Sequence, residues 1–494
     1  MQRKPLLLST IQTRIHSLVN RLSVNPHRAP SPVRVTHWFL VVALLLALWP
    51  AQVQAQSNNQ RYFALAAPFP TVTDDLSFAA LKAHWQGDTA GLGGYYPNTK
   101  LFVLRADLDA LKAVLGNNGN TVQVIDGGYN NVVVSAWAAR PGALALIPFD
   151  QLETRWKVIH IDGVNLFDKQ ANVGGYPLKV AGEANRDPNK MTVVAMTGVT
   201  ALVRGTAVMM EKKGITYPGE AIRDWLLSAD ITHISNEVSF WDKCPKPTFN
   251  DGTTMCSSPR YLELLKYVGT DVIDLTGNHL WDRGSENLST TLKIYEDLGW
   301  PYFGGGRTAQ TALDPVKLTV QGNKIAFIGC NWFGSDWATD TKPGSARCGS
   351  KSPRNLDLIT AGIKKLVGEG YLVIATLQYL ELYDYVASPQ QVRDFDAVRA
   401  AGALVVNGSQ GHNVQGFDVN DKGFIHYGTG NLFFGDQAGV GTHQTFVDRH
   451  VFYNGKYLGV DLRSAYIRDN AQPQPMTEAE RSKILRTLFK ASGY

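Results

Sequence analysis

Polar side chains that could bind a metal ion or an anion follow apolar, strand-like segments at four places in the second half of the chain. The clusters are residues 235–237 (Ser-Asn-Glu), 276–284 (Thr-Gly-Asn-His-Leu-Trp-Asp-Arg-Gly), 408–412 (Gly-Ser-Gln-Gly-His) and 427–431 (Tyr-Gly-Thr-Gly-Asn). Glycine allows a sharp turn, while asparagine and histidine offer an oxygen and a ring nitrogen as ligands or proton donors. Four such clusters at strand ends predict an active-site rim at one edge of a sheet.

The segments that must position these clusters alternate between strand-like and helical patterns across residues 189–470. Apolar strands are expected at residues 193–196, 231–234, 272–275, 325–328, 372–376 and 404–406, and helices at 218–228, 259–268, 285–298, 355–367 and 389–400. This alternation predicts an α/β fold in which helices cover a sheet. Later strands at 417–419, 424–427 and 445–447 have no helix between them and are expected to be antiparallel.

The length of the chain predicts two domains, because the roughly 440 residues beyond the leader exceed one ordinary hydrophobic core. Residues 61–188 read as a small α/β domain, in which residues 76–87 weakly resemble bacterial periplasmic solute-binding proteins. This domain is expected either to hold a small ligand or to act as a rigid spacer. Residues 189–470 form the second domain, and residues 471–494 a terminal helix that Thr477 and Glu480 begin with a capping-box pattern.

The first 55 residues are typical of a secretory leader. Residues 1–34 carry six Lys or Arg and no acid, residues 38–49 are apolar, and Val53-Gln54-Ala55 resembles a cleavage site. The apolar segment is short for a membrane span, which needs about 20 residues. We therefore expect an exported protein that is extracellular or in the cell envelope; the alternative is an uncleaved leader that anchors the chain in the membrane through residues 38–49.

The net charge of +5 comes from this leader. Beyond residue 34, 42 basic residues face 43 acidic ones. No basic stripe interleaved with aromatic residues is present, so the sequence gives no indication of a nucleic-acid partner.

All four cysteines lie beyond the leader, and an even number in an exported protein favours disulfides. We expect the pairs Cys244–Cys256 and Cys330–Cys348, because each pair brackets one irregular loop. A zinc site is the alternative, but the chain has no Cys-x-x-Cys spacing to support it.

The joint motif set resembles the bacterial CapA family, which is linked to poly-γ-glutamate capsule synthesis. The resemblance spans about residues 190–470. Its motifs are Gly198 to Arg204, Asn236-Glu237, Gly-Asn-His-x-x-Asp-x-Gly at 277–284, Gly-Gly-Gly at 304–306, Gly-x-x-x-His at 408–412 and Tyr-Gly-x-Gly-Asn-Leu-Phe-Phe at 427–434. That family looks like a branch of the calcineurin-like metallophosphatases. The resemblance therefore implies a two-sheet sandwich flanked by helices, with a divalent metal site.

Several positions depart from the family pattern. Val199 stands where the family has aspartate, Gln378 where it has the histidine of His-Trp-Gly, and Ser409 where it has a histidine. A two-metal hydrolase holds its ions about 3.5–4 Å apart and needs a bridging carboxylate and several imidazoles. These departures remove such ligands. They leave either one divalent ion (Mn, Fe or Zn) on Glu237, Asn278, His412 and Glu381, or no metal.

The resemblance also implies roles for individual residues. Asn278, His279 and Asp282 are the catalytic candidates, and Arg204 and Asn431 are the substrate-binding candidates. Structural alternatives stand beside these roles. His279 could bond a backbone carbonyl, Asp282 could cap the helix that follows, and Arg204 could pair with Glu211.

Three functions follow from these observations. The leading hypothesis is an exported CapA-like protein in extracellular polymer or capsule synthesis, which binds an anionic polymer or a phosphorylated precursor in a cleft with a reduced metal site. Its partners would be that polymer or the envelope synthesis machinery. The second is a metallophosphatase-like phosphoesterase with a mononuclear site. The third is a non-catalytic structural envelope protein. Whether the protein is an enzyme therefore stays open at the level of sequence.

Overall fold

The computed structural model describes residues 59–90, 92, 95, 96, 98–250, 252–334, 336–351, 355–435 and 438–494. Residues Asn59–Tyr494 form one compact unit. The leader predicted at residues 1–55, with its alternative roles as a signal or an anchor, lies outside the described residues. Among the helices that the structure describes, none has the length and hydropathy to cross a membrane.

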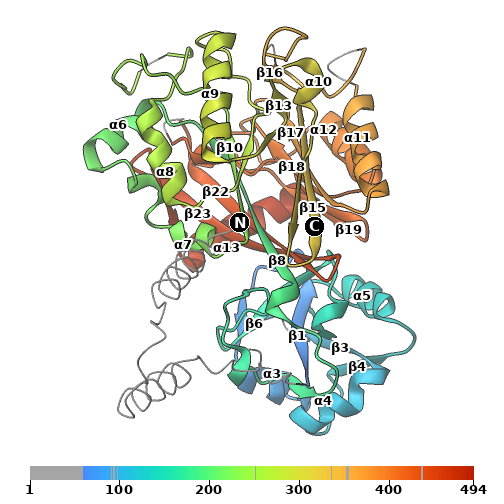
Figure 1. Ribbon diagram of the computed structural model, residues 1–494. Helices are drawn as coiled ribbons and strands as arrows, with labels where there is room; N and C mark the ends of the chain where they lie inside the picture. The colour runs from blue at the N-terminus through green and yellow to red at the C-terminus, as the bar shows by residue number, and fades with distance from the viewer. Residues whose placement is uncertain are drawn as a thin grey trace, which may run out of the picture. The chain divides into compact units, whose positions relative to one another are not determined.

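A seven-stranded mixed sheet lies at the N-terminal side of this unit (Figure 1). Its strand order is β2-β6-β1-β5-β3-β4, and β7 pairs with one end of β1. The strands are β1 (Gln60–Pro68), β2 (Asp75–Leu76), β3 (Lys100–Leu104), β4 (Val122–Ile125), β5 (Ala143–Pro148), β6 (Trp156–Ile161) and β7 (Lys179–Ala181). The helices α3 (Phe78–Trp85), α4 (Leu108–Leu115) and α5 (Tyr129–Ala138) accompany it and share its hydrophobic core.

Two further sheets follow. One has nine strands: β8 (Met191–Thr197), β9 (Val199–Thr200), β10 (Ile231–Asn236), β11 (Val272–Asp274), β12 (Tyr302–Phe303), β21 (Asn431–Phe433), β22 (Gln444–Tyr453), β23 (Lys456–Arg468) and β24 (Gln472–Pro475). The other has six: β14 (Val316–Val320), β15 (Asn323–Asn331), β17 (Leu372–Gln378), β18 (Ala403–Ser409), β19 (Phe417–Asn420) and β20 (Gly423–His426). Strands β8, β10 and β11 run parallel in the first, as do β15, β17 and β18 in the second.

The two sheets face each other across a shared core and carry helices on their outer faces. Apolar residues from both sheets, such as Met196 and Phe327, form one buried cluster. The helices α6 (Arg204–Lys213), α7 (Arg223–Leu227), α8 (Leu262–Tyr267) and α9 (Ser285–Leu298) pack with the nine-stranded sheet, and α11 (Asp357–Gly368) and α12 (Pro389–Ala400) with the six-stranded sheet. The α/β fold class with a two-sheet sandwich flanked by helices is confirmed.

The expected elements occur in their expected places. Every predicted apolar strand overlaps an observed strand, and helices α9 and α12 have the predicted bounds. The predicted helix at 218–228 is wrong in length: a short turn at Tyr217–Gly219 precedes the five-residue α7. Pro218 limits the backbone, and Gly219 packs so closely that an added Cβ would meet Val268 Cγ1 at 2.6 Å.

The terminal helix α13 (Glu478–Ala491) begins with the predicted capping box between Thr477 and Glu480. The predicted strands in the last third of the domain are antiparallel where expected, since β19 pairs with β20 and β22 with β23. The division into domains at residues 188 and 189 stays a prediction.

Both predicted disulfides are present. Cys244 bonds Cys256 and Cys330 bonds Cys348, and every cysteine of the chain is thereby paired. The first disulfide closes the loop after β10, and the second joins the end of β15 to the loop that follows it.

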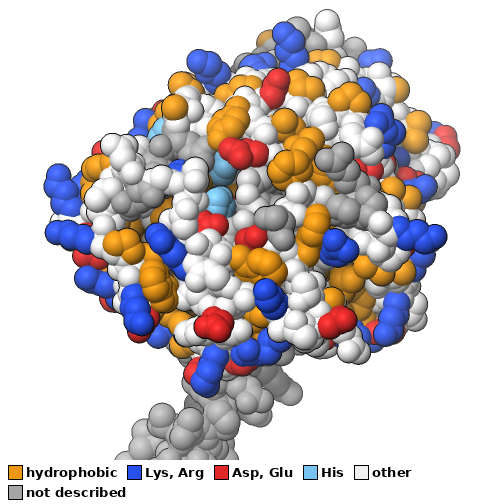
Figure 2. Space-filling model, turned by 90° about the horizontal axis from the view of Figure 1, so that it is seen from above, with side chains coloured by type: hydrophobic (Ala, Val, Ile, Leu, Met, Phe, Trp, Pro, Cys, Tyr) orange, Lys and Arg blue, Asp and Glu red, His pale blue; other side chains and the backbone are white. Residues whose placement is uncertain are grey.

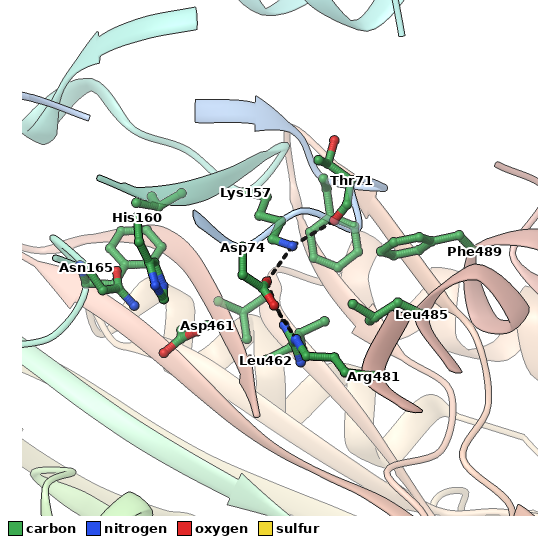
Figure 3. Close-up of a pocket in the computed structure, with 14 residues that line it drawn as sticks. Thr71, Asp74, Lys157, His160, Asn165, Asp461, Leu462, Arg481, Leu485 and Phe489 are labelled. Atoms are coloured by element: carbon green, nitrogen blue, oxygen red, sulfur yellow. Dashed lines mark hydrogen bonds and ion pairs between the residues drawn. The ribbon is translucent and has the colours of Figure 1, made fainter. Parts of the chain in front are cut away.

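The N-terminal sheet and the sandwich meet at a buried seam that contains ions as well as aromatic rings (Figure 3). Lys157 Nζ lies 2.7 Å from Asp74 Oδ1 and donates to the carbonyl oxygens of Thr71 and Val72. Arg481 of α13 holds the other side of the Asp74 carboxylate. Despite burial, these two cations hold the Asp74 pKa well below its usual range. Burial in turn lowers the pKa of Lys157 to about 8.

The stability of the sandwich should depend on pH through His450 of β22. Burial lowers the pKa of His450 to about 4, while the unfolded chain titrates near 6.5. The unfolded state therefore binds more protons as the pH falls from 6.5 to 4, and stability falls with it. We expect a loss of about 2 kcal/mol between pH 7 and pH 5 from this group.

The variant His450→Gln isolates that contribution, because glutamine can keep the 2.8 Å hydrogen bond to the Tyr457 hydroxyl. Urea unfolding at both pH values should give the variant a shallower pH dependence than the parent. Equal dependence in the two proteins would contradict the assignment.

Candidate functional site

The chain segments after β10 and β11 lie side by side at the carboxyl edge of the nine-stranded sheet. Val238 and His279 form a parallel bridge there. A Cβ added at Gly277 would meet Glu237 Cβ at 2.3 Å, so only glycine allows the Gly-Asn-His turn to approach Glu237 so closely. The sequence motif is therefore a close backbone contact as well as a set of polar groups.

The carboxyl edge of the six-stranded sheet meets this turn from the other side. Gln378, the last residue of β17, donates from Nε2 to Asn278 Oδ1 at 3.1 Å and also to Gln410 Oε1. The hydroxyl groups of Ser235 and Ser409 lie 3.4 Å apart. Residues from both sheets thus contact one another where the four predicted clusters end. We call Glu237, Asn278, His279, Gln378, Glu381 and His412 the strand-end cluster.

His279 and Asp282 form a hydrogen-bonded pair. His279 Nδ1 lies 2.8 Å from Asp282 Oδ2, which also accepts the backbone N–H of Met255 at 2.6 Å. Burial opposes protonation, but the Asp282 carboxylate and the charge of Glu237 outweigh it and raise the His279 pKa. Asp282 does not cap α9, whose N-cap is Gly284. His279 bonds a carboxylate rather than the backbone carbonyl that was its structural alternative.

His412 is held by Asn431 and approached by Glu381. Its Nδ1 lies 2.8 Å from Asn431 Oδ1, and its Nε2 lies 4.0 Å from Glu381 Oε1. Asn431 also donates from Nδ2 to the carbonyl oxygen of Thr442, so both ends of its amide are engaged in fixing His412. Figure 2, which looks onto this edge of the sandwich, shows histidine and acidic side chains close together.

Glu237 is the buried acid of the strand-end cluster. It is 2% exposed, and its Oε2 has no hydrogen-bond partner among the described residues. Burial raises its pKa, while the nearby imidazoles of His279 and His412 act in the opposite direction. The carboxyl group therefore needs a proton, a cation or the two imidazoles to compensate its charge.

Arg204 lies at the start of α6 beyond this cluster. It donates from Nε to the carbonyl oxygen of Gly252 at 3.0 Å, and its guanidinium lies over the Phe434 ring with 5.7 Å to the centroid. The alternative partner Glu211 instead pairs with Arg260 at 3.1 Å. The role of Arg204 in substrate binding stays a prediction.

A dinuclear metal centre does not fit the residues present. Val199, at the position of the family aspartate, is fully buried in an apolar cluster with Val238 and Phe434. Gln378 offers a neutral amide oxygen in place of an imidazole, and its Nε2 donates to two other amides. Within the part of the chain that the structure describes, no three His, Cys, Asp or Glu side chains are grouped to hold an ion. The single-ion site on Glu237, Asn278, His412 and Glu381 stays a prediction.

Two residues that lie beside the strand-end cluster were not predicted from the sequence. Gln410 has a positive φ of 78° and accepts from Gln378, and Asp336 accepts the backbone N–H of Trp281 at 3.0 Å and raises the His279 pKa. Gln410 belongs to the 408–412 motif, and its position in that motif could have identified it as a residue of the site. Asp336 comes from the loop closed by the second disulfide, and no motif marks it.

Comparison with known proteins agrees with the motif order. Residues 193–436 match the family described as bacterial capsule synthesis protein PGA_cap. The chain is 26% identical over 321 residues to the capsule biosynthesis protein CapA of Bacillus anthracis, covering 63% of this chain and 76% of that protein. The resemblance to the CapA family is confirmed. The CapA-like segment contains all six residues of the strand-end cluster.

Solved structures with similar segments are more distant. A 5'-nucleotidase of Staphylococcus aureus, determined with α-ketoglutarate, is 12% identical with a TM-score of 0.37, covering 60% of this chain and 58% of that one. A phosphate transporter substrate-binding protein of Clostridium perfringens is 18% identical with a TM-score of 0.22, covering 24% and 53%. The chain thus spans little more than half the length of either solved protein. The CapA relationship, together with the two disulfides, fits an exported or envelope protein with a role related to capsule synthesis.

Proposed function

We propose that this CapA-like protein acts outside the cytoplasm in capsule synthesis or attachment and binds an anionic polymer, or its phosphorylated precursor, at the strand-end cluster. The observation that carries the proposal is the meeting of Asn278, His279, Gln378 and His412 at the edges of two sheets within the CapA-like segment. Neutral amides and imidazoles that can be protonated supply N–H groups to carboxylate or phosphate oxygens.

Charge supports His279 as the main cationic contact. Its raised pKa favours the imidazolium over the neutral ring, and it is held in place by Asp282. Glu237 and Glu381 oppose a purely anionic ligand, so the two imidazoles must offset these acids before the polymer binds. This balance of charges predicts that the affinity for the anionic polymer falls as the pH rises and as salt is added.

The test is binding of poly-γ-glutamate by the chain from residue 56 onwards. His279→Gln and His412→Gln should each weaken binding about tenfold, the loss of one charge-assisted hydrogen bond of about 1.4 kcal/mol. Binding of the parent should also be tighter at pH 6 than at pH 8. The control is His160→Gln, on β6 of the N-terminal sheet, which should bind as the parent does. Equal affinity for all four proteins would rule the site out.

The alternative function is a metal-dependent phosphoesterase with one ion. It is favoured by the Glu237 Oε2 atom, which is buried without a partner and could ligate a cation. Elemental analysis of Mn, Fe and Zn, with hydrolysis of bis(p-nitrophenyl) phosphate, separates the two proposals. One ion per chain and hydrolysis lost in Glu237→Gln would establish the phosphoesterase. If the protein binds neither a metal ion nor the polymer, the remaining function is that of a structural envelope protein.

A further inference from the structure

A polar cleft of about 370 Å³ lies on the outer face of the nine-stranded sheet. Its walls come from β22, β23, α7 and the loop after β6, and include Arg449, Arg463, Trp225, Ser228 and Gln170. Arg449 pairs in register with Ala195 in the middle of β8, and Trp225 and Ser228 precede β10. The cleft therefore lies near the middle of β8 and the amino end of β10, away from the strand-end cluster at the carboxyl end of β10.

Arg449 is the most unusual group in this cleft. It is only 4% exposed, and its Nη1 is fixed by the Trp225 carbonyl oxygen and by Ser228 Oγ at 3.1 Å. Among the described residues its Nε and Nη2 have no acceptor, and the carboxylates whose charges act on it, Asp461, Asp168 and Asp230, form no ion pair with it. These two nitrogens are open to the cleft, where water or the oxygens of a ligand can accept from them.

The neighbouring cations are already neutralised. Arg463 is paired with Asp461 at 2.8 Å, and Lys169 with Asp230 at 2.5 Å. Arg449 is thus a cation of this cleft that forms no ion pair with a carboxylate in the described part of the chain. The geometry of a guanidinium matches a carboxylate through two parallel N–H bonds.

Two acids in the same cleft form no ion pair with a described residue, although the charge of Asp168 acts on both Arg449 and Arg463. Asp224 is exposed and makes no described side-chain contact, and Asp168 accepts only the backbone N–H of Gln170 through Oδ1. Their charges disfavour a ligand that is only an anion. They suit a ligand that carries an ammonium group beside its carboxylate.

We propose that this cleft binds the head group of a free α-amino acid, with its carboxylate on Arg449 and its ammonium on the side of Asp168 and Asp224. Trp225 and Arg463 also line an adjoining hollow of about 200 Å³, which reaches Ser464 and Met476. The adjoining hollow gives the amino acid's side chain room, and the head group is recognised in the first cleft. The site is independent of the strand-end cluster and of the function proposed for it.

Calorimetric titration with L-alanine, N-acetyl-L-alanine and L-alanine amide tests this recognition. L-alanine should bind saturably. N-acetyl-L-alanine has no ammonium and L-alanine amide has no carboxylate, so each should bind at least about tenfold more weakly, as expected for loss of a charge-assisted contact. Equal binding of L-alanine and N-acetyl-L-alanine would show an anion site and overturn the proposal, as would no saturable binding of L-alanine.

Two variants complete the test. Arg449→Lys should weaken L-alanine binding at least about tenfold, since lysine cannot form the bidentate contact. Asp224→Asn changes an exposed side chain and should not affect folding. It should lower the ratio of the affinity for L-alanine to the affinity for N-acetyl-L-alanine. Glu263→Gln, an exposed acid on α8 outside the cleft, is the matched control and should bind as the parent does. Unchanged selectivity in Asp224→Asn together with unchanged affinity in Arg449→Lys would also overturn the proposal.

Discussion

Replacing Asp448 with alanine is expected to lower the free energy of unfolding by about 3 kcal/mol, because it removes a buried hydrogen bond and leaves the polar partner of that bond without an acceptor. Asp448 is fully buried on β22 of the nine-stranded sheet, and its Oδ2 lies 2.6 Å from Nδ1 of His426, on β20 of the other sheet. This hydrogen bond therefore joins the two layers of the sandwich. The truncated side chain would leave a cavity and a buried imidazole without its acceptor.

Urea unfolding of the purified protein measures this loss. The variant Asp448→Asn is the matched control, because it keeps the shape and an acceptor oxygen and should lose much less. The double variant Asp448→Leu, His426→Phe should recover most of the stability, since apolar side chains of similar volume can replace a buried polar pair. If Asp448→Ala unfolds within about 1 kcal/mol of the parent, the pair does not stabilise the contact between the sheets.

The framework of the sandwich could be predicted from sequence because its signals are local. The strand at 325–328 is a continuous apolar run, and the helix at 389–400 begins with Ser388 followed by Pro389, a strong start signal. The disulfides could be paired because each joins cysteines that bracket a short loop. The capping box of Thr477 and Glu480 is another signal contained within one helical turn.

The candidate site was predictable only in part, because its contacts join residues far apart in the chain. Motif order brought Asn278 and Gln378 into the same set, but their hydrogen bond depends on how the two sheets pack face to face. Gly277 illustrates the limit: its sequence neighbours suggest a turn, whereas its closest contact is the backbone of Glu237. The cleft around Arg449 had no motif at all, since its residues come from four separate elements.

The seam between the N-terminal sheet and the sandwich could not be predicted from the sequence either. Phe69 follows β1 by one residue and is 2% exposed. Its ring contacts Phe417, Phe424 and Phe489 edge to face, with centroids 5.5–5.8 Å apart. Those rings belong to β19, β20 and α13 of the sandwich. Nothing local in the sequence marks Phe69 as a residue that joins the two parts.

Phe69→Ala is accordingly expected to lower the free energy of unfolding by about 3–5 kcal/mol, the usual effect of truncating a buried aromatic side chain. The loss combines the apolar area exposed to water with a cavity among three rings that cannot close without moving two sheets and a helix. The nearby ion pairs of Asp74 with Lys157 and Arg481 hold the same seam and restrict such movement.

Phe69→Leu keeps most of the buried volume and should lose about 1 kcal/mol, which makes it the matched control. Urea unfolding followed by both tryptophan fluorescence and far-UV circular dichroism shows whether the N-terminal sheet and the sandwich unfold together. In the parent the two transitions should coincide, and in Phe69→Ala they should separate, because the nine tryptophans beyond residue 55 and the secondary structure are distributed unequally between the two parts. A parent-like midpoint for Phe69→Ala would mean that the aromatic cluster does not couple the two parts, and the stabilising contact would then have to be the ion pairs around Asp74.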